Sequence, residues 1–600
     1  MTFKRYELTI PVELTSELHI GGVDEVPERD GKGTVIRFCR NGLKEPTIPG
    51  RSIRGAVRAA CDVARQALED AGDPATQDGG VFSKATWVSL WGDDSADTGK
   101  SLLDRRLRRD DSLPIRQSAL TFHAVSFPEY KDNDSGESPL PRRHGVGIDR
   151  TTGAASDGAL YEHEFLPRGT RFTIRITAEG RDNEPMGRDQ SDGIPGPASS
   201  ESVKKLLEVI VDILKSGAVC LGGRTGSGQG TIQVIEPKLR RTGKTTDAGA
   251  LTAPADVLDA LIGEDEEGTP IPLELGGWSL QEPARIRITW WSPTGIFVAE
   301  DQELTDRRKE EAQKKNPEAN GVTEPLRDPS VDWDEAQLLI PGTSIRGALR
   351  SRVSRIARTI LAARDELSTS TSHDLHEQIA AEPNLVRYMF GSTEYRGAVT
   401  VHDCLSTERG KRIEVTHNAI DRWTGGVIDG GLFTEAVYLG THWEPITIDI
   451  DLRQLLNNIE AEKGPEDREQ SKPTHADYAH AAYVLLGLVL AEMSAGTLPL
   501  GSRSTRGLGQ VVVTTIEVEG ADRKGVDLPS WSFTGCEALQ QPATGAGVMT
   551  DALYKGQRKL ARRVLQHLKD KYDGTDWSKR LENGPGAARK QSEGTGAADD

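Results

Sequence analysis

The chain contains an internal duplication in which three sequence blocks occur twice, in the same order. The motif Ile-Pro-Gly-Arg-Ser-Ile-Arg-Gly-Ala-Val-Arg at residues 48–58 returns at residues 340–350 with nine of its eleven positions identical, an offset of 340 − 48 = 292. Repetition at this separation indicates two copies of one domain rather than the short period of a solenoid. Because 600 residues also exceed what one hydrophobic core supports, the sequence predicts two domains.

Two further blocks repeat downstream of this motif. Ile-Asp-Arg at 148–150, followed closely by Thr-Gly, returns at 420–422. A glycine-rich block at 221–230 resembles residues 500–510, and we align its Gly-Ser-Gly-Gln at 226–229 with the Gly-Leu-Gly-Gln at 507–510. Each predicted domain therefore carries the same three segments as candidates for function.

Charge and composition narrow the class of protein. No apolar run approaches twenty residues and the N-terminus lacks an apolar leader, so we expect a cytoplasmic protein without membrane contact. Five scattered cysteines without a CxxC pair predict reduced thiols. The net charge of −18 by itself disfavours nucleic-acid binding, yet residues 340–364 hold six arginines and no acid. Since binding depends on where charges lie, basic elements within an acidic chain remain candidates for RNA contact.

Hydrophobic periodicity predicts the same element order in both repeats. Alternating residues indicate strands, and apolar residues at intervals of three and four indicate helices. The expected elements are strands at 6–14 and 284–290, helices after the Ile-Pro-Gly turns with Ser52 and Ser344 as N-caps, helices at 203–214 and 478–493, and closing strands at 231–235 and 510–513. This order predicts an α+β fold of two tandem ferredoxin-like domains.

The expected boundaries follow from composition. They are a first domain at 1–240, an acidic linker at 241–278, a second domain at 279–518 and a C-terminal extension at 519–600 that becomes disordered towards its end.

Each repeated segment can be interpreted either as an RNA-binding site or as a purely structural feature. A helix start with Arg54 and Arg58 one turn apart suits a phosphate, although solvated arginines are the alternative. The glycine-rich blocks lack the Gly-Lys-Ser/Thr ending of a nucleotide loop, so we expect no nucleotide cofactor. They suit close approach to a phosphodiester chain, or simply a tight turn. The Ile-Asp-Arg blocks predict hairpins with exposed apolar tips, where Ile148 or Ile420 could wedge between bases; a salt-bridged structural hairpin is the alternative.

Together these motifs resemble the RAMP superfamily, specifically the backbone subunits of type III CRISPR effector complexes, with two copies fused in one chain. The resemblance implies RRM-like domains that hold guide-RNA phosphates and thumb hairpins, here 148–160 and 420–432, that displace one nucleotide in six of the guide–target duplex. The implied RNA contacts are Arg51, Ser52, Arg54, Arg58, Ile148, Arg150, Arg224, Ser344, Arg346, Arg350, Ile420, Arg422, Arg503 and Arg506.

The resemblance also implies partners and an activity. The partners would be guide RNA, target RNA, other RAMP backbone subunits, and the large and small subunits of the effector complex. Family members that cut target RNA use an aspartate between the first strand and the Ile-Pro-Gly turn, together with a divalent metal ion, here expected to be Mg²⁺. Asp30 matches best, with Asp24 in reserve, and Asp328 is the candidate in the second repeat. Asp30 and Asp328 are accordingly the expected metal ligands.

Three functions remain open at this point. The chain could be a guide-binding backbone subunit that cleaves target RNA at six-nucleotide spacing, or the same scaffold without cleavage. It could also be a RAMP-type endonuclease that processes precursor guide RNA, with His144 or His417 as general acid or base. The sequence leaves open whether one, both or neither repeat cuts RNA.

Overall fold

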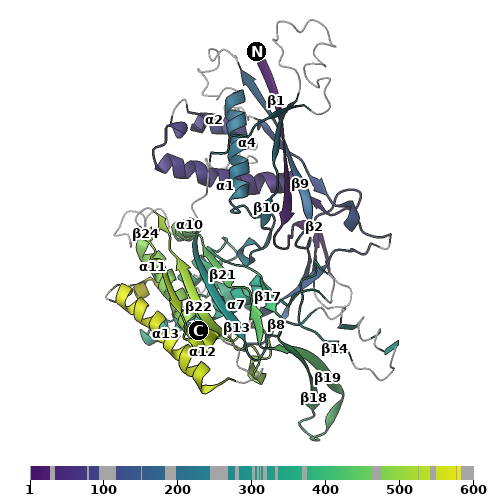
Figure 1. Cartoon of the computed structure of the whole chain (residues 1–600), viewed down its shortest axis with the longest axis vertical. Helices are drawn as coiled ribbons and strands as arrows, with labels where there is room; N and C mark the ends of the chain where they lie inside the picture. Colours follow the sequence, from purple (N-terminus) through teal and green to yellow (C-terminus); the bar gives the residue numbers. More distant parts are fainter. Residues whose placement is uncertain are drawn as a thin grey trace, which may run out of the picture.

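A computed structural model gives the structure of the chain (Figure 1). It describes all residues except 1, 28–33, 78–79, 93–116, 135, 150–151, 183–197, 243–267, 277–282, 301–304, 307–309, 311–312, 315–320, 332–334, 368–373, 463–474, 524–525, 541–548, 574, 576 and 583–600. Two main antiparallel sheets, each with its own hydrophobic core, divide the described chain into a first half and a second half.

The first half is built around β1 (Thr2–Leu14), the central strand of a six-stranded sheet. The strand order is β12 (Thr269–Ile271), β11 (Lys238–Thr242), β1, β9 (Arg171–Asp182) and β5 (Leu120–Phe122), and β10 (Ile232–Val234) also pairs with β1. Alternate residues of β1 from Tyr6 to Leu14 are buried, as expected of a strand with one face on a core. Helices α1 (Gly50–Asp70) and α4 (Ser200–Lys215) pack into that core.

The second half is built around β13 (Ala284–Ser292) in an eight-stranded sheet. The strand order is β15 (Leu339–Ile340), β17 (Cys404–Glu408), β20 (Thr441–Trp443), β13, β21 (Ile446–Ile450) and β16 (Val399–Val401), while β22 (Val512–Glu519) joins β13 to β25 (Trp531–Thr534). Helices α7 (Gly342–Ala363) and α11 (His475–Ser494) bury their apolar residues in the second core.

The two halves share one connectivity. In the first, the chain runs β1–α1–β5–β9–α4–β10, and these strands lie side by side in the order β10, β1, β9, β5. In the second, it runs β13–α7–β16–β21–α11–β22, with the order β22, β13, β21, β16. Both are the βαββαβ arrangement of a ferredoxin-like domain. The predicted α+β fold of tandem ferredoxin-like domains is therefore confirmed.

Each half also carries a smaller sheet that contains a long hairpin. In the first half this sheet has the order β2 (Gly21–Pro27), β3 (Thr34–Phe38), β8 (Ala155–Glu164) and β7 (Arg142–Ile148). In the second half it has the order β14 (Val322–Thr323), β19 (Val427–Leu439) and β18 (Lys411–Ile420). The β18–β19 hairpin extends from the body of the protein (Figure 1).

Shorter elements complete the two halves. They are β4 (Thr47–Ile48), β6 (Val125–Ser126) and α2 (Lys84–Trp91) in the first half, and α8 (Leu375–Ala380), α9 (Asn384–Phe390), α10 (Leu452–Glu462), β23 (Asp522–Arg523), β24 (Val526–Asp527), α12 (Glu537–Gln540) and α13 (Asp551–Tyr572) in the second. Among the described residues, no helix is both long and apolar enough to cross a membrane.

Two expected boundary regions contain more structure than composition suggested. The segment expected as a linker, 241–278, includes β12, which pairs with β11 and so extends the first sheet. The expected extension, 519–600, includes α13, whose buried residues belong to the second core. Disorder was expected towards the end of this extension, and residues 583–600 lie outside the described residues.

The expected N-caps are wrong in both repeats. Helices α1 and α7 begin at Gly50 and Gly342, with Pro49 and Pro341 as the N-cap residues and no side-chain cap. Proline has no N–H to satisfy and its fixed φ suits a chain that is about to enter a helix. The repeated serines consequently lie inside the first turn, where their N–H groups donate to the proline carbonyls.

Candidate nucleic-acid interface

The two Ile-Asp-Arg blocks form hairpins of the same register. Ile148 pairs with Ala155 at the end of β7–β8, and Ile420 pairs with Val427 at the end of β18–β19. In both hairpins the register shifts just before this last pair. The sequence prediction of two equivalent hairpins therefore holds in the described residues.

The aspartate of each block shapes the turn. An Asp149 carboxylate oxygen accepts a hydrogen bond from the Thr152 N–H at 3.2 Å. The matching oxygen of Asp421 accepts from the Trp423 and Thr424 N–H groups at 2.7 and 2.9 Å, and these bonds lower the pKa of Asp421. The glycine that follows in each turn has a left-handed φ, near +70°. The motif thus encodes an Asx-type turn, which explains why Asp and Gly recur together.

Apolar side chains line the ends of both hairpins. The exposed ones are Val146, Ile148 and Leu160 in the first hairpin and Ile420, Trp423, Val427, Ile428 and Leu432 in the second. Trp423 is 97% exposed, the extreme among these side chains. Sequence reasoning missed it, although it occupies the variable position of the Ile-Asp-Arg-x-Thr-Gly motif. Exposed aromatic side chains are suited to stacking on nucleic-acid bases.

The two hairpins differ in their surroundings. In the first, Asp149 is buried, and its carboxylate also accepts from the Gln378 side chain of α8 in the second half, at 3.0 Å. Leu375 of the same helix lies against Gly147, where an added Cβ would meet its Cδ2 at 2.6 Å. The first hairpin is therefore anchored to the second repeat near its turn.

The repeated helix arginines make equivalent internal contacts. Arg54 donates to the carbonyl of Trp91, the last residue of α2. Arg346 donates at 2.6 Å to the carbonyl of Phe390, the last residue of α9. Each guanidinium also lies over the ring of that aromatic residue, 5.8 and 5.5 Å from the centroid. Burial lowers the pKa of Arg346 to about 10. These arginines satisfy helix C-terminal carbonyls, a role the sequence analysis did not consider.

The other predicted contacts on these helices vary in accessibility. Arg58 pairs with Asp62 at 3.7 Å, and Arg350 pairs with buried Glu382 at 2.6 Å. Arg51 and Ser344 are exposed, whereas Ser52 is half-buried. Phosphate contact at these residues stays a prediction.

An internal carboxylate occupies part of the second helix start. The Gly342 N–H donates to an Asp403 carboxylate oxygen at 2.7 Å. Since unpaired N–H groups at a helix start attract anions, Asp403 supplies from within the chain a charge like that expected from RNA.

The glycine-rich blocks have one conformation in both repeats. Arg224 and Arg503 have left-handed φ values of 57° and 63°, and each precedes a single 3₁₀ turn, η4 (Thr225–Ser227) or η6 (Ser504–Arg506). Gly228 and Gly507 end these turns with φ of 73° and 90°. Gly228 therefore corresponds to Gly507, so the alignment of Gly-Ser-Gly-Gln at 226–229 with 507–510 is wrong by two residues, whereas the pairing of Arg224 with Arg503 is confirmed.

The arginines of these blocks contact the hairpins. Arg224 donates to the Tyr161 hydroxyl at 3.1 Å and lies 4.8 Å from the centre of its ring. Arg503 pairs with Glu435 at 2.5 Å, and exposed Arg506 lies over Phe433 at 6.0 Å. Loop and hairpin thus contact each other in each repeat.

The first glycine-rich loop docks on the second repeat, at the start of α7. A Cβ added to Gly228 would lie 2.8 Å from His402 Cα, and one added to Gly342 would lie 2.7 Å from the Ser227 carbonyl oxygen. Among the residues that the structure describes, a Cβ added to Gly507, the equivalent of Gly228, would meet no atom within 4 Å. The loop of the first repeat is therefore packed, whereas that of the second is open.

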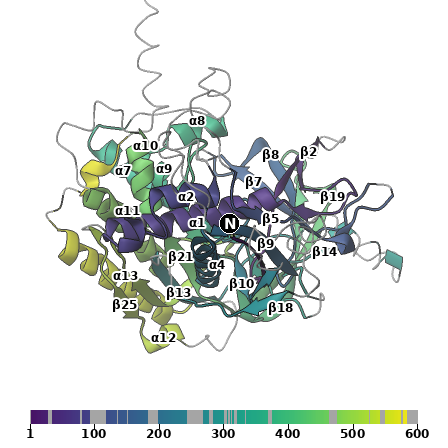
Figure 2. The same cartoon turned by 90° about the horizontal axis from the view of Figure 1, so that it is seen from above.

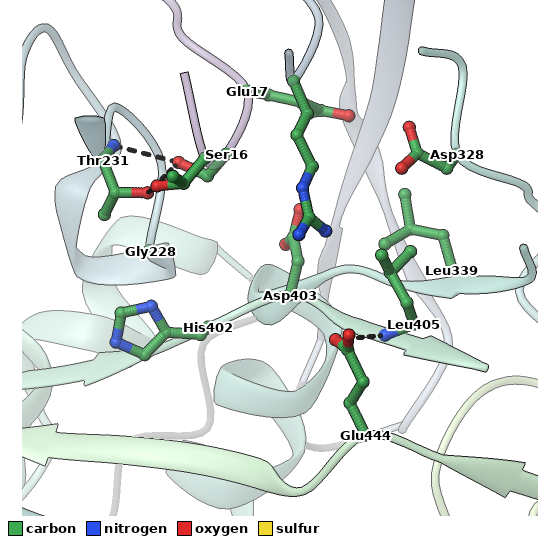
Figure 3. A pocket seen from close by; sticks show the side chains of 12 residues that line it. Ser16, Glu17, Gly228, Thr231, Asp328, Leu339, His402, Asp403, Leu405 and Glu444 are labelled. Carbon is green, nitrogen blue, oxygen red and sulfur yellow. Dashed lines mark hydrogen bonds between the residues drawn. The ribbon is translucent and has the colours of Figure 1, made fainter. Parts of the chain in front are cut away.

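A pocket of about 200 Å³ lies between the two halves (Figure 3). It is lined by Thr15, Ser16, Glu17, Arg168, Gly228 and Thr231 of the first half and by Asp328, Leu339, His402, Asp403, Leu405 and Glu444 of the second. The side chains of Glu17 and Asp328 point toward each other across one side of the pocket. This region brings acidic side chains of both repeats together.

Glu17 is a buried acid of this pocket whose pKa is strongly raised. Burial raises its pKa to about 8, against the opposing effect of Arg143 and with further repulsion from Asp403 and Asp328. Arg143, at the base of the first hairpin, donates to one Glu17 oxygen and lies 3.5 Å from Asp403. The other Glu17 oxygen has no hydrogen-bond partner among the described residues.

The three candidate catalytic aspartates lie in different parts of the chain. Asp328 lines the pocket, and one of its oxygens accepts from the Ser330 N–H and hydroxyl at 2.9 and 2.6 Å. Asp24 lies in β2, and Asp30 lies outside the described residues. Within the described residues, no three His, Cys, Asp or Glu side chains form a group that could hold a metal ion. Asp328 is therefore not part of a complete metal site in the described chain.

The remaining predicted contacts lie on the hairpin turns. Arg422 is exposed beside Trp423, whereas its counterpart Arg150 lies outside the described residues. His144 and His417, the candidate acid–base residues, approach Glu162 and Glu435 at 3.2 and 3.3 Å. Both histidines thus face a carboxylate on the opposite strand of their own hairpin.

Tandem ferredoxin-like domains that carry matched hairpins and basic, glycine-rich loops define a class of RNA-binding repeat protein. The RAMP superfamily model matches residues 12–233 and 337–512, a large part of each half of the fold. The chain belongs to the RAMP superfamily, whose members are CRISPR-associated, RNA-binding proteins. No curated protein matches the chain.

Proposed function

We propose that this chain is a guide-RNA-binding backbone subunit of a type III CRISPR ribonucleoprotein, in which its two repeats fill consecutive positions. The supporting observation is the pair of hairpins with equal register and exposed apolar ends on successive repeats. Two regularly spaced wedges suit a guide–target duplex that is interrupted at regular intervals. Guide RNA and target RNA are the expected ligands.

The contact between the repeats supports this arrangement. The glycine-rich loop of the first repeat packs against the helix start of the second, while the equivalent loop around Gly507 is open. A contact of this kind is head-to-tail, because the two surfaces differ, and head-to-tail contacts can be repeated to form an open series when the rotation between units does not close a ring. Other RAMP backbone subunits would continue the series, and the large and small subunits of the effector complex would complete it.

The hairpin ends would act on the bases rather than on the phosphates. Ile420 and Trp423 present exposed apolar surface, and base stacking on an aromatic ring contributes about 1–3 kcal/mol. Insertion at this point would unstack one nucleotide of the duplex and expose the adjacent linkage.

We further propose target-RNA cleavage with a divalent metal ion, expected to be Mg²⁺. Asp328 contributes a carboxylate to the acidic pocket between the repeats, and Asp30 would serve the equivalent loop of the first repeat. The described residues do not by themselves make a metal site, so this part of the proposal rests on Asp30, Asp24 and Asp328 as candidates.

The decisive experiment is a cleavage assay with the full chain assembled on guide RNA and its partner subunits. End-labelled target RNA should yield fragments six nucleotides apart in the presence of Mg²⁺ and none with chelator. Asp30→Ala and Asp328→Asn should each remove one cut while target affinity is unchanged, because a carboxylate contributes no attraction to phosphates. Asp365→Asn provides a control acid at the end of α7.

Other results would identify the alternatives. Undiminished cutting in Asp30→Ala, Asp24→Ala and Asp328→Asn would leave the chain as a scaffold whose partners cut RNA. Cleavage of precursor guide RNA that requires His144 or His417 would instead identify a processing endonuclease.

A further inference from the structure

Helix α13 (Asp551–Tyr572) is a basic element that lies outside the family match, which ends at residue 512. It carries seven lysines and arginines and only two acids, Asp551 and Asp570, in a chain of net charge −18. The two acids lie near the ends of the helix, so its middle is purely basic. The family match therefore does not explain why this helix is basic.

One face of α13 is fixed in the second core. Leu553, Leu560, Val564 and Leu568 are buried, and the buried Gln557 side chain donates to the Val511 carbonyl at 2.8 Å. These contacts set the rotation of the helix about its axis. The opposite face is consequently presented to solvent in a defined orientation.

That opposite face is a stripe of cations, which we call the α13 stripe. Its members are the exposed side chains of Lys555, Arg558, Lys559, Arg562 and Lys569. Their spacing of three, four and seven residues places them on one side of the helix, over a length of about 21 Å at 1.5 Å per residue. None of them forms an ion pair in the part of the chain that the structure describes.

Aromatic side chains of β25 border the α13 stripe. Arg563 lies 4.7 Å from the centre of the Phe533 ring and donates to the Thr534 carbonyl at 2.7 Å. Trp531 and His567 have ring centroids 5.2 Å apart beside it. Cations next to half-buried rings are the combination used by sites that bind single-stranded nucleic acid.

The α13 stripe is remote from the hairpins. Figures 1 and 2 both place α13 on one side of the second half and the β18–β19 hairpin on the other. An RNA segment that contacts the hairpins would therefore reach α13 only by passing around the domain, or as a separate segment.

We propose that the α13 stripe is a second RNA-binding surface, which holds the phosphates of a single-stranded segment distinct from the one at the hairpins. Like charges one turn apart repel one another, and a bound polyanion relieves this repulsion. RNA fits better than an acidic protein because the middle of the stripe is cationic, whereas stable protein interfaces are built around an apolar centre. The exposed apolar side chains of this helix, Tyr554 and Leu565, lie at the edge of the stripe. Phosphate contacts of this kind are independent of sequence.

The test measures binding of fluorescein-labelled oligouridine to the full chain across roughly 50–200 mM salt. The variant Arg558→Gln/Lys559→Gln/Arg562→Gln should bind more weakly, and its salt slope should fall by about 2, since each lost contact to a single strand removes about 0.7. The control Lys131→Gln/Lys215→Gln/Lys238→Gln loses the same charge at exposed sites elsewhere and should keep the wild-type slope.

The outcomes separate this proposal from the proposed function. An unchanged slope in the α13 variant, with its thermal unfolding also unchanged, overturns the second surface and leaves docking of an acidic protein as the remaining reading. If the α13 variant is unchanged but Trp423→Ala weakens binding in the same experiment, the second surface is overturned while the proposed function at the hairpins still stands. Equal slope losses in the stripe and control variants would also overturn the proposal, because they would reflect net charge alone.

Discussion

The two repeats share a fold but differ in what surrounds their loops and hairpins. In the first repeat, Gly228 packs against His402 and the hairpin turn is anchored through Asp149 to Gln378. In the second, a Cβ at Gly507 would meet no atom of the described residues within 4 Å, and Trp423 is almost fully exposed. Equivalent sequence positions therefore have different energetic roles, because one copy is buried against its neighbour and the other is open.

Alanine substitutions at the two loop glycines should give the largest difference in stability between the repeats. Gly228→Ala combines the cost of a left-handed alanine, about 1–2 kcal/mol, with a clash against His402 that adds about 1–3 kcal/mol. Gly507→Ala should cost only the first amount. Urea unfolding of both variants measures the difference, and equal losses would show that the loop contact between the repeats contributes nothing.

The acidic pocket between the repeats should make stability depend on pH. Because the folded-state pKa of Glu17, about 8, exceeds the usual glutamate value of 4.5, its contribution to stability is fully present below pH 4.5 and is lost as pH rises through 8. Glu17→Gln cannot ionise, so it should gain a few kcal/mol relative to wild type between pH 5 and pH 9. Parallel pH profiles of unfolding free energy for the two proteins would contradict a buried, protonated Glu17.

The exposed tryptophan should affect RNA binding without affecting the fold. Trp423→Ala should weaken RNA binding by about 1–3 kcal/mol through loss of stacking. Its unfolding free energy should stay within about 0.5 kcal/mol of wild type, since the side chain is 97% exposed. Leu43→Ala, at another exposed apolar residue, is the control and should leave affinity unchanged. A filter-binding titration in which both variants match wild type would remove Trp423 from the interface.

Alanine substitutions at the turn aspartates should give the smallest difference in stability between the repeats. Both Asp149→Ala and Asp421→Ala lose an Asx turn, but only the first also loses a hydrogen bond to the buried Gln378 side chain. A hydrogen bond contributes about 0.5–1.5 kcal/mol net, so Asp149→Ala should be the more destabilising by about that amount. Thermal unfolding provides the comparison, and restoring Asp149→Ala with Gln378→Leu should recover part of the loss.

Local sequence patterns predicted the parts of this molecule that depend on local forces. The strand period of β1, the helix after each Ile-Pro-Gly turn and the Asp-and-Gly hairpin turns follow from residues close in the chain. The duplication then supplied the long-range order, since two copies of one pattern imply one topology.

Contacts between distant segments were not predictable in the same way. Arg54 and Arg346 looked like phosphate ligands because nothing local shows that the carbonyls of Trp91 and Phe390 lie within their reach. Likewise, no local pattern indicates that the first glycine-rich loop docks on the second repeat, or that α13 joins its core. Of the candidate site, the hairpins were predictable, whereas the pocket between the repeats was not.

The covalent union of the repeats changes how strongly the loop contact at Gly228 must hold. Two surfaces on one chain meet at an effective concentration in the millimolar range or above, so a weak contact suffices to keep them together. If the proposed series of subunits forms, the open loop around Gly507 would lack this advantage and would meet its neighbour only at the much lower concentration of a separate protein. On that proposal, a shared strand of RNA would act as the tether that the chain itself does not provide.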